Sequence, residues 1–496
     1  MTRLRPWPLA ASTSAAALLL ALLWFPSLIG ARWYSDEGVF AAVAQSWRDG
    51  GTLYADAWDN KPPLIFATYA AGQALFGDSL VSVRALAMLF AMGAVGLAVI
   101  IGTRLYGHAR GAVAGIVTAT VLGTPVFEGN LALTEVFMIV PAAAGMLVTM
   151  IAVDRRDGTD ARVSIAAGIC FGLAMGYKQV ALFDLAAASL LILLLHPRPA
   201  RMLAWLAAAA AIPQVAFLLF FVATGAGGEY LYAIVGSMAP YAAAVEDPKP
   251  AWSTVLGYAP AAVALMYVVA ARWSFDVRAF PTIWFALAFA SAASSPYAFP
   301  HYLVQAAVPF ALVAAGMHVP SPGRLRIPRS GFDALAHTAL VLATAAAAVA
   351  VFGPEIRDRQ QSSPRWYYAT SLLYLRGQIS HAEYEGRMDG SAYSMHAITL
   401  EIQHDERGET LFQWASFPWL YSATALRNPT PFATPWLAEW VPGARARIID
   451  DLQADPPAYI VTSTSVEPFP ALDWITTRDY ELIRAQDDWQ LYGLID

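Results

Sequence analysis

Runs of apolar residues, separated by short polar segments, dominate the first 354 positions of the chain. A helix needs about 20 mostly apolar residues to cross the hydrocarbon core of a bilayer. Eleven runs meet or approach that length: 9–29, 79–103, 111–127, 131–152, 163–177, 179–195, 202–223, 253–271, 279–294, 299–318 and 333–353. The pattern therefore predicts an α-helical polytopic membrane protein with about 11 transmembrane helices.

The pattern changes after residue 354, where the chain becomes polar, proline-bearing and rich in Trp and Tyr. P-P-A-Y-I-V at 456–461 is typical of a strand that follows a turn, and I-I-D-D-L-Q before it is typical of a helix end. The residues at 480–492 predict two strands joined by a D-D turn. We expect a membrane domain at 1–354 and a small α/β domain at 355–496.

Composition agrees with a membrane location. Hydrophobic residues make up 57% of the chain, charged residues 14%, and the mean hydropathy is +0.48, whereas soluble proteins are about 25% charged. The single cysteine, Cys170, excludes an intramolecular disulfide and a cysteine-based metal site. Charges are few and lie mostly in short loops, which argues against nucleic-acid binding.

Arginine and lysine define the expected orientation, because they are retained on the cytoplasmic side of short loops. With the N-terminus inside, the cytoplasmic segments hold Arg3, Arg5, Arg104, Arg110, Arg155, Arg156, Arg162, Arg198, Arg201, Arg272, Arg278, Arg324, Arg326 and Arg329. The outer loops hold Arg32, Arg48, Lys61, Lys178 and Lys249. This distribution places the long loop 30–78 and the C-terminal domain outside. A cleaved signal peptide at 1–31 is the alternative, but Ile29-Gly30-Ala31 is a poor cleavage site.

Two adjacent carboxylates, Asp36 and Glu37, stand in S-D-E-G directly after the first apolar run. The following V-F-A-A-V-A-Q-S-W has apolar positions at helical spacing and predicts an amphipathic helix in the membrane interface. The carboxylates would lie at the N-terminal end of this helix, where negative charge is favoured. Ser35 or Asp36 could act only as a helix cap, and the pattern leaves capping and catalysis equally open.

A lysine, Lys61, stands in D-N-K-P-P-L at the end of the same outer loop. Pro62 and Pro63 predict an extended approach to the next helix. A lysine at the interface can merely extend its ammonium group toward water. Against that reading, Lys61 is the only lysine in the first 177 residues of a chain that otherwise uses arginine.

Two further charges belong to the outer boundary. Glu135, in L-A-L-T-E-V-F-M, falls on the first turn of a predicted membrane helix, with Glu128 just before it. Glu135 is either a partner of the helix dipole or a site residue. Lys178, in Y-K-Q, occupies the outer tip of a helical hairpin, where it can bind an anion.

His301 and Gln305 stand in F-P-H-Y-L-V-Q, and in an α-helix their spacing would put them on one face. His301 fits a hydrogen-bonded interfacial residue better than a metal ligand. The outer loop 224–251 carries Tyr230 and Tyr232 and is a candidate lid. Arg84, just inside the second helix, could anchor the outer loop or contact a donor phosphate.

These residues favour one chemistry. No phosphate-binding glycine loop and no D-x-D motif is present, so a nucleotide-bound donor is not supported. An anion approached from the outer leaflet suits a lipid phosphate, which lysines can neutralise as a leaving group. A carboxylate can act as general base toward a hydroxyl or amine. We expect glycosyl transfer from a polyprenyl-phosphate sugar, with membrane lipids and an extracytoplasmic protein, lipid or glycan as partners.

Two other classes stay open. A lipid-linked sugar flippase would place ionisable groups at mid-membrane depth, where Asp184 is the clear candidate. A scaffold protein would leave the clustering of charges at the outer face unexplained.

The five motifs together resemble the bacterial family 39 glycosyltransferases of the GT-C superfamily, which are related to protein O-mannosyltransferases and to the aminoarabinose transferases acting on lipid A. The resemblance covers residues 9 to about 320. It implies a GT-C fold in a bacterial inner membrane and an inverting hexosyl- or pentosyltransferase.

The same resemblance implies roles for single residues. Asp36 matches the catalytic aspartate, Glu37 its acidic neighbour, and Lys61 the lysine that contacts the donor phosphate. Glu135 matches a second acidic position in the cavity, and Lys178 a basic residue near the phosphate. The family implies no certain cofactor and leaves a divalent metal open. Asn60 stands where aminoarabinose transferases tend to have Glu, which puts a metal site at that position in doubt.

Overall fold

A computed structural model of the chain describes residues 5–154, 160–244, 249–271, 277–317, 331–405 and 407–495. The chain packs into two compact units: unit 1 is Met1–Pro26, Arg84–Ala216 and Asp247–Tyr367, and unit 2 is Ser27–Val83, Phe217–Glu246 and Tyr368–Asp496. The expected domain boundary at residue 354 stays a prediction. Of the expected cytoplasmic arginines, Arg3, Arg155, Arg156, Arg272, Arg324, Arg326 and Arg329 lie outside the described residues.

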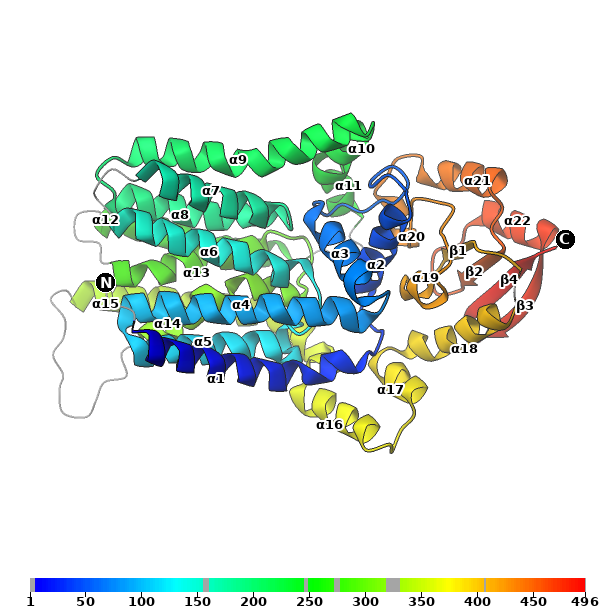
Figure 1. The fold of residues 1–496 in the computed structure, drawn as a ribbon, viewed down its shortest axis with the longest axis horizontal. Coiled ribbons are helices and arrows are strands. Elements are labelled where there is room, and N and C mark those ends of the chain that lie inside the picture. The colour runs from blue at the N-terminus through cyan, green and yellow to red at the C-terminus, as the bar shows by residue number, and fades with distance from the viewer. Residues whose placement is uncertain are drawn as a thin grey trace. The chain divides into compact units, whose positions relative to one another are not determined.

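Long apolar helices make up most of unit 1 and run side by side (Figure 1). Each of the eleven apolar runs contains a helix. They are α1 (Pro6–Trp24), α4 (Leu80–Tyr106), α5 (His108–Gly123), α6 (Thr134–Asp154), α7 (Asp160–Met175), α8 (Leu182–Leu195), α9 (Pro199–Ala223), α12 (Ala251–Ala271), α13 (Phe280–Ala293), α14 (Ala307–Gly316) and α15 (Gly331–Asp358). Among the described residues, six helices are long and apolar enough to cross a membrane by themselves.

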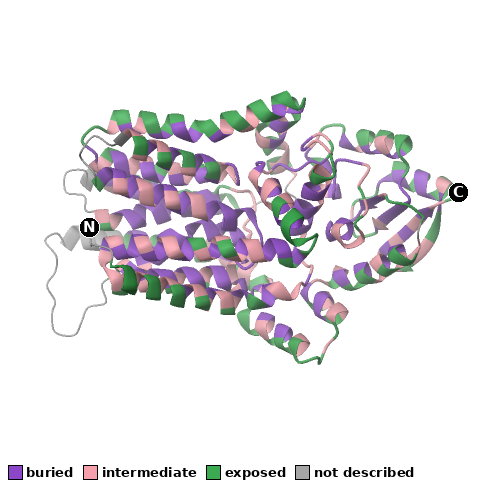
Figure 2. Ribbon diagram, in the orientation of Figure 1, coloured by how far each residue is buried: buried purple, intermediate pink, exposed green. Residues whose placement is uncertain are grey.

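Helix α13 lies at the centre of unit 1. All of its residues are buried, as Figure 2 shows for the interior of the helix bundle. A helix that is apolar on every side is stable only where other helices surround it, and α13 packs against α8, α12, α14 and α15. Asp184 on α8 is also buried there, and its Oδ1 accepts a hydrogen bond of 2.6 Å from the indole of Trp284 on α13.

Short 3₁₀ elements connect the helices: η1 (Phe25–Ile29), η2 (Pro125–Phe127), η3 (Gln179–Ala181), η5 (Val277–Ala279), η6 (Pro300–Ala306) and η7 (Gln360–Ser362). Unit 2 contains shorter helices: α2 (Ser35–Arg48), α3 (Leu64–Phe76), α10 (Gly227–Leu231), the π-helical turn η4 (Tyr232–Gly236), α11 (Met238–Ala243), α17 (His381–Met388), α18 (Gly390–His404), α19 (Trp419–Thr424), α20 (Pro435–Glu439), α21 (Ala444–Ala454) and α22 (Pro470–Asp479). Helix α16 (Pro364–Leu375) belongs mostly to unit 2.

A four-stranded sheet in unit 2 has the order β1-β2-β4-β3. Its strands are β1 (Leu411–Trp414), β2 (Tyr459–Ser463), β3 (Tyr480–Gln486) and β4 (Trp489–Leu494). β1 and β2 are parallel, and the chain between them passes through helices, as a parallel connection requires. β3 and β4 form an antiparallel hairpin around Asp487, whose φ of +52° belongs to the turn. The strand at 459, the helix before it and the D-D hairpin are confirmed.

Candidate active site

The carboxylates Asp36 and Glu37 lie in the first turn of α2, in unit 2. The residue before the helix is Tyr34, and no side chain caps the helix by a hydrogen bond. The capping role considered for Ser35 or Asp36 is therefore wrong, because both residues are already inside the helix. Their place at the positive end of the helix dipole is confirmed. Asp36 is half-buried, whereas Glu37 is fully buried.

The glycine of S-D-E-G has a packing reason. A Cβ on Gly38 would lie 2.8 Å from the backbone nitrogen of Trp419 and 2.9 Å from Cγ of Pro418. The indole of Trp419 donates a 2.9 Å hydrogen bond to the carbonyl oxygen of Tyr34. The start of α19 thus sits against the first turn of α2, and this contact fixes the position of Asp36.

Lys61 lies in the same unit, and two neighbours in the sequence contact its ammonium group. Nζ donates a 2.7 Å hydrogen bond to Oδ1 of Asn60 and is 3.6 Å from Oδ1 of Asp59. The backbone is held as well, because the hydroxyl of buried Tyr54 donates a 2.8 Å hydrogen bond to the carbonyl oxygen of Lys61. The lysine is therefore positioned by the turn that precedes α3.

Asp59 is a site residue that sequence reasoning did not select. It is 1% exposed, and its Oδ1 has no hydrogen-bond partner. Burial raises its pKa; the charge of Lys61 opposes this rise and the charge of Asp36 adds to it. We call Asp59 and Lys61, together with Asp36, whose charge raises the pKa of Asp59, the α2 cluster. The acidic residue of D-N-K-P-P-L was the available signal.

The two tyrosines assigned to a lid pack inside unit 2. The ring of Tyr230 is buried, stacks on Phe221 at 4.7 Å and lies 5.5 Å from the ring of Tyr54. The hydroxyl of Tyr232 donates a 2.7 Å hydrogen bond to the carbonyl oxygen of Trp440. Tyr230 thus supports Tyr54, the residue that holds the backbone of Lys61.

In unit 1, Glu135 lies in the first turn of α6 and is 1% exposed. Thr134 donates a 2.8 Å hydrogen bond to its Oε2, and Lys178 donates a hydrogen bond to its Oε1. The ammonium of Lys178 also lies 4.1 Å from the centre of the Tyr302 ring. Placement of Lys178 between α7 and η3 agrees with the predicted hairpin tip. A buried carboxylate is stable only when it is paired and hydrogen-bonded, and Glu135 meets both conditions.

A second buried carboxylate continues this network. Nδ1 of His301 is 2.8 Å from Oε2 of Glu128, and Nη1 of Arg359 donates a 2.8 Å hydrogen bond to Oε1 of Glu128. Nε2 of His301 lies 4.0 Å from Oε1 of Glu135. We call the chain Arg359, Glu128, His301, Glu135 and Lys178 the α6 network. Sequence reasoning missed Arg359, because 231 positions separate it from Glu128.

Gln305 does not join His301. It accepts a 3.0 Å hydrogen bond from the hydroxyl of Ser291 on α13. The expectation that His301 and Gln305 share a face is wrong, because η6 is a 3₁₀ helix with three residues per turn. Pro309 explains the geometry: it has no N–H for the carbonyl of Gln305, and its ring would clash with that carbonyl in an α-helix.

The predicted site residues divide between the units. Unit 2 holds Asp36, Glu37, Lys61, Tyr230 and Tyr232, and unit 1 holds Arg84, Glu135, Lys178, His301 and Gln305. The side chain of Arg84 is 1% exposed in α4, where the sequence placed it. Asp184, the residue on which a transport pathway would depend, is hydrogen-bonded to Trp284 in the core of the helices.

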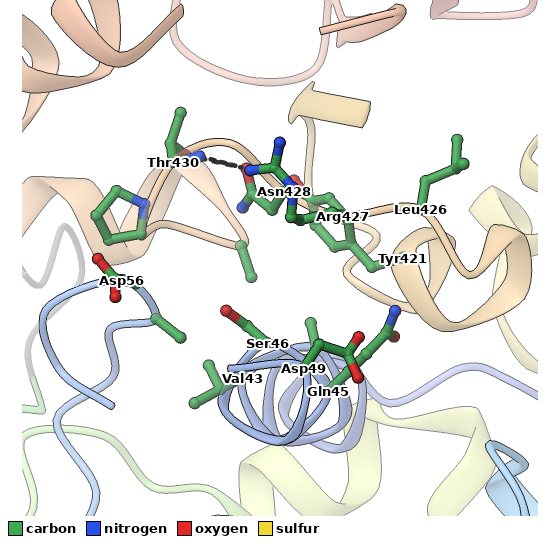
Figure 3. Close-up of a pocket in the computed structure, with 14 residues that line it drawn as sticks. Val43, Gln45, Ser46, Asp49, Asp56, Tyr421, Leu426, Arg427, Asn428 and Thr430 are labelled. Atoms are coloured by element: carbon green, nitrogen blue, oxygen red, sulfur yellow. Dashed lines mark hydrogen bonds between the residues drawn. The ribbon is translucent and has the colours of Figure 1, made fainter. Parts of the chain in front are cut away.

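A small open pocket in unit 2 lies between α2 and segment 421–433 (Figure 3). Gln45, Asp49 and Asn428 are among its lining residues. Asp36, Asp59 and Lys61 are not among its lining residues.

Metal binding was left open by the sequence. Within the described ranges, no group of three or more His, Cys, Asp or Glu side chains is arranged to hold a metal ion. At position 60, where aminoarabinose transferases tend to have Glu, the amide oxygen of Asn60 accepts a hydrogen bond from Lys61.

Comparisons with known proteins show which folds and families the chain resembles. A family model described as dolichyl-phosphate-mannose-protein mannosyltransferase matches residues 60–224, about a third of the chain. A search of curated proteins found no match to the chain.

Solved structures match the whole chain. The crystal structure of ArnT from Cupriavidus metallidurans bound to undecaprenyl phosphate has a TM-score of 0.63 at 15% identity, and the match covers 98% of each chain. The apo state of the same protein has a TM-score of 0.62 at 15% identity, also over 98% of each chain. The chain therefore shares the fold of ArnT, and the predicted helical architecture with a small C-terminal sheet is confirmed.

Proposed function

We propose that the protein is an inverting membrane glycosyltransferase that moves a sugar from a polyprenyl-phosphate donor to an acceptor. The observation that carries the proposal is the α2 cluster: Asp36 lies in the first turn of α2, and Lys61 is held beside buried Asp59 in the turn that precedes α3. The family match and the fold of ArnT, which was solved with undecaprenyl phosphate bound, support a polyprenyl-phosphate donor.

Asp36 is the general base in this proposal. It takes the proton of an acceptor hydroxyl or amine, the acceptor atom bonds to the anomeric carbon, and the bond from that carbon to the phosphate oxygen breaks. One displacement inverts the anomeric configuration. Asp36 suits the role because it is half-buried, whereas Glu37, assigned to the catalytic pair as its acidic neighbour, is fully buried.

Lys61 and Lys178 neutralise the phosphate that leaves. Charge that develops on the leaving oxygen is stabilised by cations that are already in place, because little reorganisation is then needed. Asn60 and Asp59 hold the ammonium of Lys61, and Glu135 holds that of Lys178. Arg84 is assigned to the donor as a third cation.

Other assignments complete the proposal. We assign four residues to the substrate cavity or to the acceptor: His301, Gln305, Tyr230 and Tyr232. The protein lies in a bacterial inner membrane with its N-terminus in the cytoplasm and residues 355–496 outside.

The decisive experiment replaces the base. Asp36→Asn removes the proton acceptor but keeps the shape of the side chain, so we expect transfer to fall by about 10²–10⁴-fold while donor binding persists. Asp49→Asn is the matched control, because Asp49 ends the same helix away from the α2 cluster. Transfer is measured with a purified polyprenyl-phosphate sugar. Full activity of the Asp36→Asn enzyme would disprove the assignment.

A double-mutant cycle tests whether the two lysines act on one phosphate. If both contact the same phosphate, Lys61→Ala and Lys178→Ala together cost less than the sum of the two single effects on the free energy of donor binding, by about 0.5–3 kcal/mol. Titration with undecaprenyl phosphate gives the four affinities, those of the original protein, the two single variants and the double variant. Strict additivity would assign one lysine to another role.

A further inference from the structure

The open pocket between α2 and segment 421–433 contains a buried amide that the fold leaves unsatisfied. Gln45 on α2 lines this pocket and is only 7% exposed. Within the described parts of the chain, no group donates a hydrogen bond to its Oε1. A buried polar atom without a partner costs stability, so each one that a native protein retains requires an explanation, such as a bound water, ion or ligand. Gln45 therefore points to an occupant of the pocket.

Two further unsatisfied atoms belong to residues next to the lining. Gln413 on β1 donates a 2.8 Å hydrogen bond from Nε2 to the carbonyl oxygen of Ala433, and its backbone N–H donates a 3.3 Å bond to the hydroxyl of Tyr421. Both acceptors line the pocket. Among the described residues, Oε1 of Gln413 and Oγ1 of Thr434 are buried without a hydrogen-bond partner. Three such oxygens around one pocket favour a built polar site.

The rim opposite α2 is held in one conformation. Nδ2 of Asn428 donates a 2.9 Å hydrogen bond to the carbonyl oxygen of Phe432, and its Oδ1 accepts bonds of 3.0 and 3.1 Å from the N–H and the hydroxyl of Thr430. The carbonyl oxygen of Pro431 accepts a 2.9 Å bond from the N–H of Trp58. Figure 3 shows Asn428 and Thr430 on this rim, across the pocket from α2. A rim that is ordered before binding loses little conformational entropy when a ligand enters.

The polar groups of the pocket are better suited to accept hydrogen bonds than to donate them. Asp56 is exposed, and its Oδ2 accepts a 2.8 Å bond from the N–H of Thr52. The guanidinium of Arg427 donates a 2.7 Å bond to Asp455, so this cation already has a partner. Oε1 of Gln45 is a further acceptor. The pocket therefore suits a ligand that donates hydrogen bonds, such as a hydroxyl or an ammonium group, and disfavours a phosphate.

Apolar side chains complete the lining: Ala42, Val43, Ala57, Leu426 and Pro431. A sugar ring has hydroxyl groups at its edge and C–H groups on its faces, so it matches a site with a few polar groups among apolar ones. Because the pocket is small and open, it suits one edge of a sugar rather than a whole ring.

Two elements connect the pocket with the α2 cluster. Helix α2 holds Asp36 in its first turn and Gln45 nine residues later, about 13 Å along the helix axis. Segment 52–61 contributes Asp56 to the pocket and Lys61 to the cluster. A ligand in the pocket therefore contacts the same helix and the same segment that carry the proposed base and its lysine.

We infer that this pocket is a binding subsite for a sugar without phosphate, either neutral or amine-bearing, which directs hydroxyl or ammonium hydrogens at Gln45 and Asp56. That this sugar is part of the acceptor rests on the proposed function. Asp49 makes no contact with the sugar in this inference, because its carboxylate is 51% exposed and is paired with Arg48 at 3.3 Å.

Saturation-transfer NMR of the full-length protein in detergent tests the subsite with glucose, glucosamine and glucose-6-phosphate as probes. We expect glucose and glucosamine to bind and glucose-6-phosphate to bind more weakly. Gln45→Leu removes the amide but keeps most of its volume, and Asp56→Asn keeps the shape of the carboxylate. Each should weaken glucose binding by about two- to tenfold, the loss of one hydrogen bond. Asp56→Asn should weaken glucosamine binding further, because the ammonium also loses a charged acceptor.

Asp450→Asn is the matched control. Burial raises the pKa of Asp451 on α21, and the charges of Asp450 and Asp56 both add to the rise, so these two acids lie in one acidic region. Asp450 is exposed and does not line the pocket. Its substitution should therefore leave sugar binding unchanged. Unfolding temperatures are measured for all variants; if Gln45→Leu does not fold, Asp56→Asn, at an exposed residue, decides the test.

The outcomes are distinguishable. Absence of glucose and glucosamine binding by the original protein, or equal binding by the original protein and both pocket variants, would overturn the subsite and leave the proposed function intact. An equal loss in Asp450→Asn would overturn the contact with Asp56. Tighter binding of glucose-6-phosphate than of glucose would overturn the ligand class. Sugar binding by a protein that transfers nothing from a polyprenyl-phosphate sugar would overturn the acceptor role and the proposed function, while the subsite itself would stand.

Discussion

Glu135 and Asp59 are both buried carboxylates beside a lysine, yet their surroundings differ. Both oxygens of Glu135 accept hydrogen bonds, from Thr134 and Lys178. Oδ1 of Asp59 accepts none, and the ammonium of Lys61 is 3.6 Å from it. Burial costs a carboxylate little when both oxygens are bonded and more when one is not, so the burial of Asp59 is the more costly of the two.

This difference separates a carboxylate with a structural role from one that can affect activity. A satisfied acid such as Glu135 stabilises its fold and fixes the lysine that it binds. Burial raises the pKa of Asp59, and the negative charge of Asp36 adds to that rise. We therefore expect substitutions at Glu135 to be measured mainly as lost stability, and those in the α2 cluster mainly as changed activity and pH dependence.

The largest effect on stability is expected for Glu135→Gln. The change leaves the ammonium of Lys178, whose side chain is 15% exposed, without its carboxylate. Breaking a buried pair by removing one partner costs about 3–5 kcal/mol. The loss is measured in detergent as a lower unfolding temperature, read from the fraction of purified protein that stays monodisperse after heating.

Two controls sharpen this test. Glu229→Gln, at an exposed acid on α10, should leave the unfolding temperature unchanged. The double change Glu135→Gln with Lys178→Met removes both charges and should recover part of the stability. A single change at Glu135 without measurable loss would remove the distinction between the two acids.

The sequence predicted much of this arrangement, because membrane helices and boundary charges carry strong local signals. Asp36, Lys61, Glu135 and Lys178 were found because charge at a membrane boundary is costly and therefore informative. The pairing of Arg359 with Glu128 could not be found, since it depends on how helices far apart in the chain pack together.

Local backbone geometry was the second feature that the sequence did not predict. The face shared by His301 and Gln305 was predicted from an α-helical period, and the 3₁₀ form of η6 removed it. Asp59 was passed over because a short polar loop gives no sign of which residue becomes buried. Its 1% exposure follows from the packing of unit 2 around it.

An intermediate effect is expected for Gly38→Ala. The added methyl group would meet the backbone of Trp419 at 2.8 Å, and overpacking of this kind costs about 1–3 kcal/mol. Because the same contact sets the start of α2, transfer should fall by more than stability alone explains. Gly228→Ala is the matched control, since a Cβ at that helical glycine meets nothing within 4 Å. Equal activity of the two variants would show that Asp36 does not depend on this contact.

The smallest effect is expected for Asp59→Asn, and its sign is the informative part. The pKa of Asp59 in the folded protein is raised above the ordinary value of 3.8, chiefly by burial. The folded state therefore holds this proton more tightly than the unfolded state, and stability falls as the pH rises from about 3.8 through the raised pKa. An asparagine cannot ionise, so the variant should lack this fall and should be more stable at neutral pH, within about 1 kcal/mol. Unfolding temperatures of both proteins between pH 4 and pH 8 test this, with the exposed Asp49→Asn as control. A variant that is less stable than the original protein at every pH would mean that the pair with Lys61 satisfies Asp59, as the pair with Lys178 satisfies Glu135. The two acids would then differ only in the distance between carboxylate and ammonium.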